Sequence, residues 1–284
     1  MAHSKKTLLI LSLLLLAAIV FALPMGRYPL ALGDLCRSLL DAWAGRPLNE
    51  EQSRQLFLFF DLRLPRIGAA LVVGACLSAS GTVYQNMFQN PLVSPGILGV
   101  QHGAAFGAAI GIVFFSSWPL TQAFSFAGGT LGVGLSLFFA WLYPRARFLA
   151  LVVGGLVSSS FFVALTSLVQ YVADPNRQLP ELVYWLMGTL SRTEPRQLAW
   201  SLPPMLAGVI NWVGLVIPHV MRFIIGPDNR VGLAASALGG ALFVLLTDTL
   251  IRSVWTVELP LGIATSLISM PLFAFSLWYD WKRR

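Results

Sequence analysis

The sequence predicts an all-α, polytopic helical membrane protein with about eight transmembrane helices, arranged as one transmembrane domain over residues 1–284. Hydrophobic residues make up 56% of the 284 residues, charged residues only 11%, and the mean hydropathy is +0.73. Soluble domains carry about 25% charged residues, so this chain cannot have a mostly hydrated surface. Disordered proteins, disulfide scaffolds and ordinary soluble enzymes are therefore excluded.

The net charge of +7 is spread along the chain and forms no dense basic run. This pattern is typical of charges that set the orientation of membrane spans and the docking of partners, and it argues against nucleic-acid binding.

The predicted spans are apolar runs close to 20 residues long, the length of helix that crosses a bilayer core. The first run follows Lys5 and Lys6, so a secretory signal is an alternative to a first span. An uncleaved span is favoured because the rest of the chain is equally apolar. The eight runs are Thr7–Leu23, Arg66–Met87, Ile97–Trp118, Gln122–Leu142, Phe148–Val172, Leu198–Pro218, Val231–Ile251 and Leu261–Trp278.

Residues 24–64 lie between the first two spans and mix polar and apolar residues. Their leucines recur at near-helical spacing, which predicts an outer loop that contains an interfacial helix. These leucines are Leu30, Leu32, Leu35, Leu39 and Leu40.

Basic residues predict the orientation of the spans. With the N-terminus in the cytoplasm, the inside loops are strongly basic, whereas acidic residues balance the arginines of the outside loops. Both termini are therefore predicted to be cytoplasmic. The inside loops hold Lys5, Lys6, Arg145, Arg147, Arg222, Arg230, Lys282, Arg283 and Arg284, opposed by Asp228 and Asp280.

Glycines recur at four-residue intervals in two of the spans, and close helix packing is the favoured interpretation. They are Gly103, Gly107 and Gly111 in one span and Gly128, Gly132 and Gly134 in the next.

No motif of a phosphate loop, zinc protease, CxxC site or serine hydrolase occurs in the sequence. The histidines His3, His102 and His219 have no carboxylate or thiol partners at metal-ligand spacing, and Cys36 and Cys76 are interpreted as ordinary small apolar residues. The chain is therefore predicted not to be an enzyme, to bind no metal or cofactor itself, and to be unable to hydrolyse ATP unaided.

Asp248 is the one ionisable residue that lies clearly inside a predicted span, and Arg252 follows it one helical turn later. Such a pair can neutralise itself, so a structural role near the outer interface is favoured. A proton-coupled carrier would bury more carboxylates along its path, which weakens that alternative.

Two proline-containing motifs flank the second span. Arg63-Leu64-Pro65-Arg66 opens it, and the segment Asn90–Val100 (NPLVSPGILGV) follows it. Pro91 and Pro95 cannot lie in an unbroken helix, since each lacks a backbone donor and clashes with the preceding turn. Broken helix at membrane depth packs in protein or lines a cavity, so a break at the cytoplasmic end of a span suits a gate.

The ordered set of motifs resembles the FecCD family, the permease subunits of type II ABC importers for iron-siderophore, haem and cobalamin. The stretch YWLMGTLS at Tyr184–Ser191 is also similar to the YWxxG stretch of this family. The four blocks that match in order are RLPR at Arg63–Arg66, NPLVSPGILGV at Asn90–Val100, VGLVIPH at Val213–His219 with GPDNR at Gly226–Arg230, and ELPLGI at Glu258–Ile263.

The resemblance implies a permease of the bacterial inner membrane that carries a metal chelate, with ferric siderophore or haem as the expected cargo. It implies that two copies of the permease form a homodimer with the translocation path of the substrate at the dimer axis. It also implies two cytoplasmic ATPase subunits that use ATP and Mg²⁺. A periplasmic binding protein would deliver the chelate, and residues 24–64 would lie in the periplasm.

The resemblance also implies roles for particular residues. Arg63, Arg66 and Arg252 are expected at the outer surface, where they would receive glutamates of the binding protein; snorkelling at the interface is the alternative. Asn90 and Leu92 are expected at the cytoplasmic constriction, in the gate segment that also holds Pro91 and Pro95.

The sequence departs from the family pattern in one place. Family members have ten spans, but here Pro203–Ile210 runs directly into Asn211–Leu215, and the ATPase-coupling loop and seventh span are missing. The predicted deletion lies at about 210–211, and fusion leaves one span over Leu198–Pro218, which preserves the topology downstream.

A natural deletion or an error in the recorded sequence is favoured over a working eight-span pump. The alternative functions are a transport-defective membrane remnant that lacks the coupling loop, and a carrier that works without an ATPase.

Overall fold

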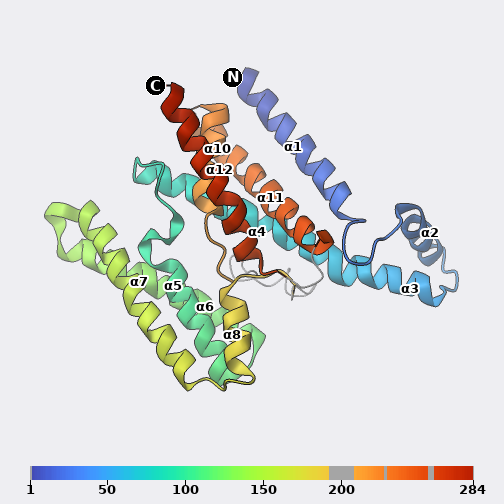
Figure 1. Ribbon diagram of the computed structural model, residues 1–284, viewed down its shortest axis with the longest axis horizontal. Helices are drawn as coiled ribbons and strands as arrows, with labels where there is room; N and C mark the ends of the chain where they lie inside the picture. Colours follow the sequence, from blue (N-terminus) through green and yellow to red (C-terminus); the bar gives the residue numbers. More distant parts are fainter. Residues whose placement is uncertain (1, 192–207, 227–228, 255–258, 284) are drawn as a thin grey trace. The chain divides into compact units, whose positions relative to one another are not determined.

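The computed structural model describes residues 2–191, 208–226, 229–254 and 259–283, and all regular structure in these ranges is helical (Figure 1). The chain forms two compact units. The first comprises the described parts of Met1–Val83, Leu190–Leu206 and Asn211–Arg284, and the second comprises those of Tyr84–Thr189 and Ala207–Ile210.

The first unit holds the N-terminal and C-terminal helices. In Figure 1, α1 lies alongside α11, and both α10 and α12 contact α11. The helices are α1 (Ala2–Ala22), α2 (Leu32–Trp43), α3 (Glu50–Phe57), the π-helix η1 (Leu58–Arg63), α4 (Leu64–Met87, which continues into the second unit), α10 (Val213–Ile225), α11 (Asn229–Val254) and α12 (Leu261–Arg283).

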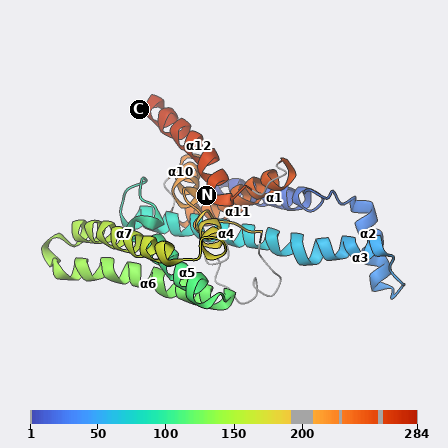
Figure 2. The same cartoon turned by 60° about the horizontal axis from the view of Figure 1, so that its bottom comes forward.

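The second unit is built on three helices, α5, α6 and α7, which lie side by side in both views (Figures 1 and 2). Its elements are the 3₁₀-helix η2 (Pro95–Leu98), α5 (Val100–Ile110), the π-helix η3 (Gly111–Phe115), α6 (Trp118–Leu142), the 3₁₀-helix η4 (Pro144–Ala146), α7 (Arg147–Val172) and α8 (Gln178–Leu186).

The helices account for most of the predicted spans. Within the described ranges six helical segments are long and apolar enough to cross a membrane: Lys5–Ala22, Glu50–Met87, Trp118–Leu142, Pro144–Val172, Val231–Val254 and Leu261–Tyr279. Of two shorter apolar helices, Val100–Phe115 lies within the predicted span Ile97–Trp118, and Val213–Ile225 overlaps only the last six residues of the predicted span Leu198–Pro218.

The predicted continuous span over Leu198–Pro218 is wrong in the part that the structure describes. Residues 208–212 are not helical, and α10 begins only at Val213 and continues past Pro218. The backbone of Trp212 has φ of 71°, a conformation that cannot continue an α-helix. The earlier part of this predicted span, residues 198–207, lies outside the described residues.

A proline explains the irregular turn that precedes α4. The helix from Glu50 to Met87 is continuous, but its turn Leu58–Arg63 is π-helical. Pro65 lacks an amide hydrogen, and its ring crowds the carbonyl one turn earlier, so regular α spacing cannot persist there. The wider turn brings Arg63 onto the buried side of the helix.

The segment between the first two spans contains two helices, where the sequence predicted one. Asn49 and Gln52 form a capping box that starts α3, since each side chain accepts from the other residue's backbone N–H. Ser38 of α2 donates to Gln55 Oε1 of α3 at 3.0 Å, so the two helices are held together.

Glycines allow close helix contacts in both units, as the predicted packing role requires. In the first unit, a Cβ on Gly74 of α4 would overlap the carbonyl of Gly240 on α11. In the second, Gly103 of α5 meets Gly128 of α6 in the same way. Gly134 has nothing within 4 Å of an added Cβ, so its predicted packing role is wrong.

Candidate functional site

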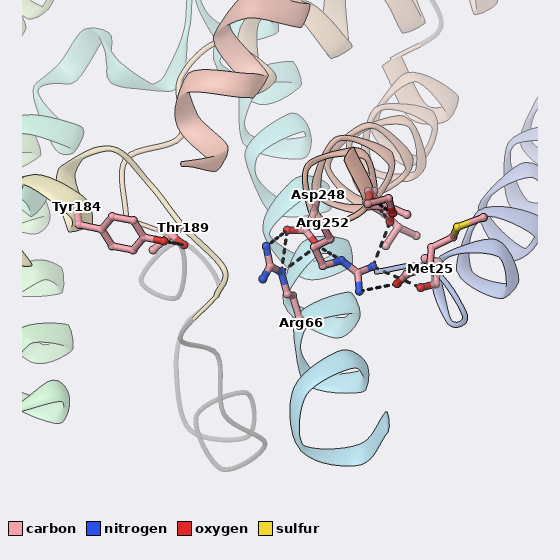
Figure 3. A network of polar contacts seen from close by, with 10 residues as sticks. Met25, Arg66, Tyr184, Thr189, Asp248 and Arg252 are labelled. Atoms are coloured by element: carbon pink, nitrogen blue, oxygen red, sulfur yellow. Dashed lines mark hydrogen bonds and ion pairs between the residues drawn. The ribbon is translucent and has the colours of Figure 1, made fainter. Parts of the chain in front are cut away.

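A buried aspartate in the first unit binds two arginines (Figure 3). Asp248 lies on α11 with no exposed surface. The Nε of Arg66, on α4, donates to Asp248 Oδ1 at 2.9 Å and to Oδ2 at 3.1 Å, and its Nη2 lies 2.9 Å from Oδ1. Arg252, one turn along α11, places its Nε 3.1 Å from Oδ2. One carboxylate therefore joins guanidinium groups from two helices.

Arg252 also reaches the connector between α1 and α2. Its Nη1 and Nη2 donate to the carbonyls of Met25 and Ala22, both at 3.4 Å, and Nη2 also donates to Thr249 Oγ1 at 3.3 Å. Irregular backbone needs partners for its carbonyls, and here an arginine of α11 provides them.

Arg63 binds the same connector from the π-helical turn. Its guanidinium donates to the backbone carbonyls of Leu23 and Tyr28, and only 6% of the residue is exposed. Arg63 and Arg252 thus fasten the connector to two helices of the first unit.

The arginines line a pocket of about 220 Å³ in the first unit. Its polar lining comes from Arg27, Tyr28, Ser191 and the three arginines already described; the other lining residues are apolar or glycine. Among the described residues that line the pocket none is acidic, although Asp248 contacts two of the lining arginines. Such a pocket attracts anionic groups, and guanidinium groups suit carboxylates in particular.

The structure brings together all three arginines that the sequence singled out for docking. It confirms the local ion pair of Asp248 with Arg252 and adds Arg66 as a second partner of the carboxylate. Nothing in the sequence pattern indicated that Arg66 pairs with Asp248, because the two residues lie 182 positions apart. Sequence reasoning also missed the connector carbonyls that Arg63 and Arg252 bind.

The predicted gate residues lie in the second unit, in a turn that breaks the helix as expected. After α4 ends, Asn90 Oδ1 accepts from Leu92 N at 2.9 Å, and Pro95 begins the short helix η2. Asn90 is exposed, 55% of Leu92 is exposed, and Pro91 is half-buried. The turn therefore presents an amide and a leucine on its surface.

A buried cluster anchors this turn on either side of its exposed residues. Phe88, Val93 and Leu98 are buried together, with Ile97 and Val133 packed against them. Gly99 follows with φ of 75°, and a Cβ there would meet Ser158 of α7. The break is thus a packed turn with a defined conformation.

The YWxxG stretch forms the end of α8. Gly188 has φ of 73° and its amide donates to the carbonyl of Trp185, which ends the helix. The hydroxyls of Tyr184 and Thr189 lie 3.3 Å apart across this turn (Figure 3).

In the described part of the chain no three His, Cys, Asp or Glu side chains lie close enough together to hold a metal ion. His219 of α10 packs edge-on against Phe273 of α12, at 5.5 Å between ring centroids. Cys36 and Cys76 are free thiols.

Comparison with known proteins identifies the family. The FecCD transport family matches residues 14–209 and 204–279. The molybdate import system permease protein MolB of Haemophilus influenzae is 34% identical, covering 98% of this chain and 96% of its own. The hemin transport system permease protein HmuU of Yersinia pestis is 28% identical, covering 97% and 96%.

Two further relatives extend this picture. A Helicobacter pylori protein named "Probable iron chelatin transport system permease protein" is 31% identical, covering 83% of this chain and 86% of its own. A solved structure, described as an inward-facing conformation of a metal-chelate type ABC transporter, is 31% identical with a TM-score of 0.83, covering 97% and 99%.

The family model matches the chain in two parts, and these two parts overlap at residues 204–209. The alignment with MolB runs over 331 positions, more than the 284 residues of this chain, so MolB contains residues without a counterpart here. The family match and the helical fold nevertheless extend over both sides of the division. The chain therefore belongs to the FecCD transport family and is a multi-pass membrane permease subunit of an ABC importer for a metal chelate or a similar substrate, with ATP hydrolysed by a separate subunit.

Proposed function

We propose that this permease imports an iron chelate, a ferric siderophore or haem, across a bacterial inner membrane. Relatives named for iron chelatin and for hemin transport support this cargo. The permease would act as a homodimer with two cytoplasmic ATPase subunits and a periplasmic binding protein, and both of its termini would be cytoplasmic.

The observation that carries the proposal is the pocket lined by four arginines, with no acidic side chain among its described lining residues. In the proposed complex, carboxylates of the binding protein approach this pocket, where Arg63, Arg66 and Arg252 converge. Complementary charges of this kind govern orientation and association rate more than affinity.

The turn at Asn90 and Leu92 is proposed as the cytoplasmic gate. Its conformation is held by the Asn90–Leu92 hydrogen bond and by the buried cluster of Phe88, Val93 and Leu98. Leu92 is exposed on this turn, and in the proposed homodimer it would meet the same residue of the second copy. A hydrophobic side chain on a rigid turn suits a constriction.

A transport-defective chain is the second candidate, and the divided family match favours it specifically. The division at residues 204–209 lies beside the non-helical stretch 208–212, where the sequence indicates a missing coupling loop and span. Without that loop the ATPase would lose its main docking surface. A natural deletion and an error in the recorded sequence would both produce this pattern; a diverged working variant would require coupling through another inside loop.

An ATPase-independent carrier is disfavoured by the state of Asp248. Among the described residues Asp248 is the only buried carboxylate, and two arginines bind it. A proton path through the membrane uses several buried carboxylates, and the described residues offer only this one, which is already engaged in two ion pairs.

Uptake in a permease-null strain tests the proposal. The strain would express this chain with the ATPase and substrate-binding protein encoded in the same genome, and uptake of labelled ferric siderophore, haem and molybdate would be measured. Iron-chelate uptake above the empty vector supports the proposed cargo, and uptake of molybdate alone replaces it with the MolB substrate.

A chimera separates the working permease from the defective one. The segment of MolB that has no counterpart here would be inserted between Ile210 and Asn211. If the chain reaches the membrane but only the chimera transports, the defective alternative holds. Resequencing the gene across these two codons then distinguishes a natural deletion from a recording error.

A further inference from the structure

We infer that Asp248 is a positioning residue for partner docking: its carboxylate holds the guanidinium groups of Arg66 and Arg252 together as one docking unit. The inference rests on the proposed function, in which carboxylates of the binding protein meet these arginines. It assigns a role in docking to a residue that would not itself touch the partner.

The geometry places the carboxylate behind the arginines. Arg66 and Arg252 belong to the pocket lining, whereas Asp248 does not. Asp248 has no exposed surface, while the side chains of Arg66 and Arg252 are 14% and 9% exposed. A partner at the pocket would therefore meet guanidinium groups that the buried Asp248 carboxylate already contacts (Figure 3).

The bonding restricts both arginines. Arg66 makes a forked contact through Nε and Nη2, which fixes the plane of its guanidinium group as well as its position. Arg252 contacts the other carboxylate oxygen through Nε and extends its Nη atoms towards the connector carbonyls. Long arginine side chains lose much rotamer freedom on binding, and prior ordering by Asp248 removes part of that cost from the docking step.

The charge balance makes the inference testable. Asp248 offsets part of the positive charge of Arg66 and Arg252, and four arginines line the pocket, so the pocket attracts anions. If only charge mattered, removal of the Asp248 charge would strengthen the binding of an acidic partner. Positioning predicts the opposite result, because the two arginines would lose their common anchor.

The ion pair is also not the only tie between its two helices. Gly74 of α4 and Gly240 of α11 pack with their backbones in close contact elsewhere along the same helices. The helix pair therefore has a packing contact that remains when Asp248 changes to Asn.

The experiment measures binding of the substrate-binding protein from the uptake assay to the full-length permease in nanodiscs, at low and high salt. Asp248→Asn removes the charge at nearly constant shape. Arg66→Lys keeps the positive charge but removes the contact that the two guanidinium nitrogens, Nε and Nη2, make with the Asp248 carboxylate. Asp61→Asn is the matched control, because Asp61 is exposed on the π-helical turn and the change in charge is the same.

Positioning predicts that Asp248→Asn and Arg66→Lys each weaken binding by at least about tenfold, while Asp61→Asn leaves it unchanged or slightly tighter. Tighter or unchanged binding with Asp248→Asn overturns the inference. If that variant does not give a monodisperse protein in the nanodisc, Arg66→Lys decides, and unchanged binding there overturns it equally.

Arg66→Ala separates the inference from the proposed function. If Arg66→Ala weakens binding but Asp248→Asn and Arg66→Lys do not, docking at the arginines stands and the positioning role fails. If the wild type does not bind, or Arg66→Ala binds as well as the wild type, both the docking proposal and the inference fail.

Discussion

Arg66 and Asp248 are 182 residues apart in the chain, and the Nε of the arginine donates to both carboxylate oxygens, at 2.9 and 3.1 Å. This contact links a helix that begins after the π-helical turn to a helix near the C-terminus. With Arg252 on the same carboxylate, it builds one wall of the arginine pocket from two distant parts of the sequence.

Loss of the central carboxylate is expected to destabilise the first unit. Asp248→Ala leaves Arg66 and Arg252 in a largely buried place without their anion, and breaking a buried ion pair in this way costs about 3–5 kcal/mol. The free energy of unfolding, measured by denaturant titration in micelles, should fall by about this amount. The control Asp61→Ala should stay within about 0.5 kcal/mol of the wild type; equal stability of both variants would show that the pair contributes little.

Arg63 is expected to order the connector between α1 and α2. Arg63→Ala removes both donors to the carbonyls of Leu23 and Tyr28, so amide hydrogen exchange across residues 22–30 should accelerate. Arg27→Ala, at an exposed position of the same connector, should leave exchange unchanged. Equal protection in the wild type and Arg63→Ala would contradict the role of these hydrogen bonds.

Two glycines of the second unit are expected to respond very differently to the same change. Gly103→Leu inserts a side chain where the backbones of α5 and α6 meet, so it should prevent stable assembly of the bundle. Gly134→Leu, on α6 with no atom near an added Cβ, should be tolerated. The yield of monodisperse protein after detergent extraction is the measurement, and similar yields from the two variants would contradict the packing.

Thiol labelling tests the orientation of the gate turn. In a background with Cys36 and Cys76 replaced by Ser, Leu92→Cys should react with a membrane-impermeant maleimide in inside-out vesicles, because the side chain is exposed and the turn is predicted to be cytoplasmic. Arg27→Cys should react only from the other side. Labelling of both positions from the same side would contradict the predicted topology.

Composition and motif spacing were sufficient for the fold class and for most spans, because apolar length alone decides what crosses a bilayer. They also located the broken helix at Asn90, since Pro91 and Pro95 forbid a continuous one. The failures have local causes. Trp212 adopts a positive φ that no pattern reveals, which interrupts the predicted fused span. Gly134 follows Gly132 by two residues, about 200° around a helix, so it leaves the packed face.

The site was predicted less completely than the fold. The Asp248–Arg252 pair follows from helical periodicity, because residues four apart share a face. The bond from Arg66 to Asp248 depends on how α4 packs against α11, and the bonds from Arg63 depend on the path of the connector. Neither arrangement is encoded in local spacing.

Import into proteoliposomes tests the proposed function most directly. The purified chain would be reconstituted with its ATPase and substrate-binding protein, and labelled ferric siderophore accumulated in the lumen would be measured with and without ATP. We predict accumulation that requires both ATP and the binding protein and that falls when Arg66 is replaced by Ala. Accumulation no greater than in liposomes without the permease, although the assembled chain is present, would contradict the proposal that this chain is a working iron-chelate permease.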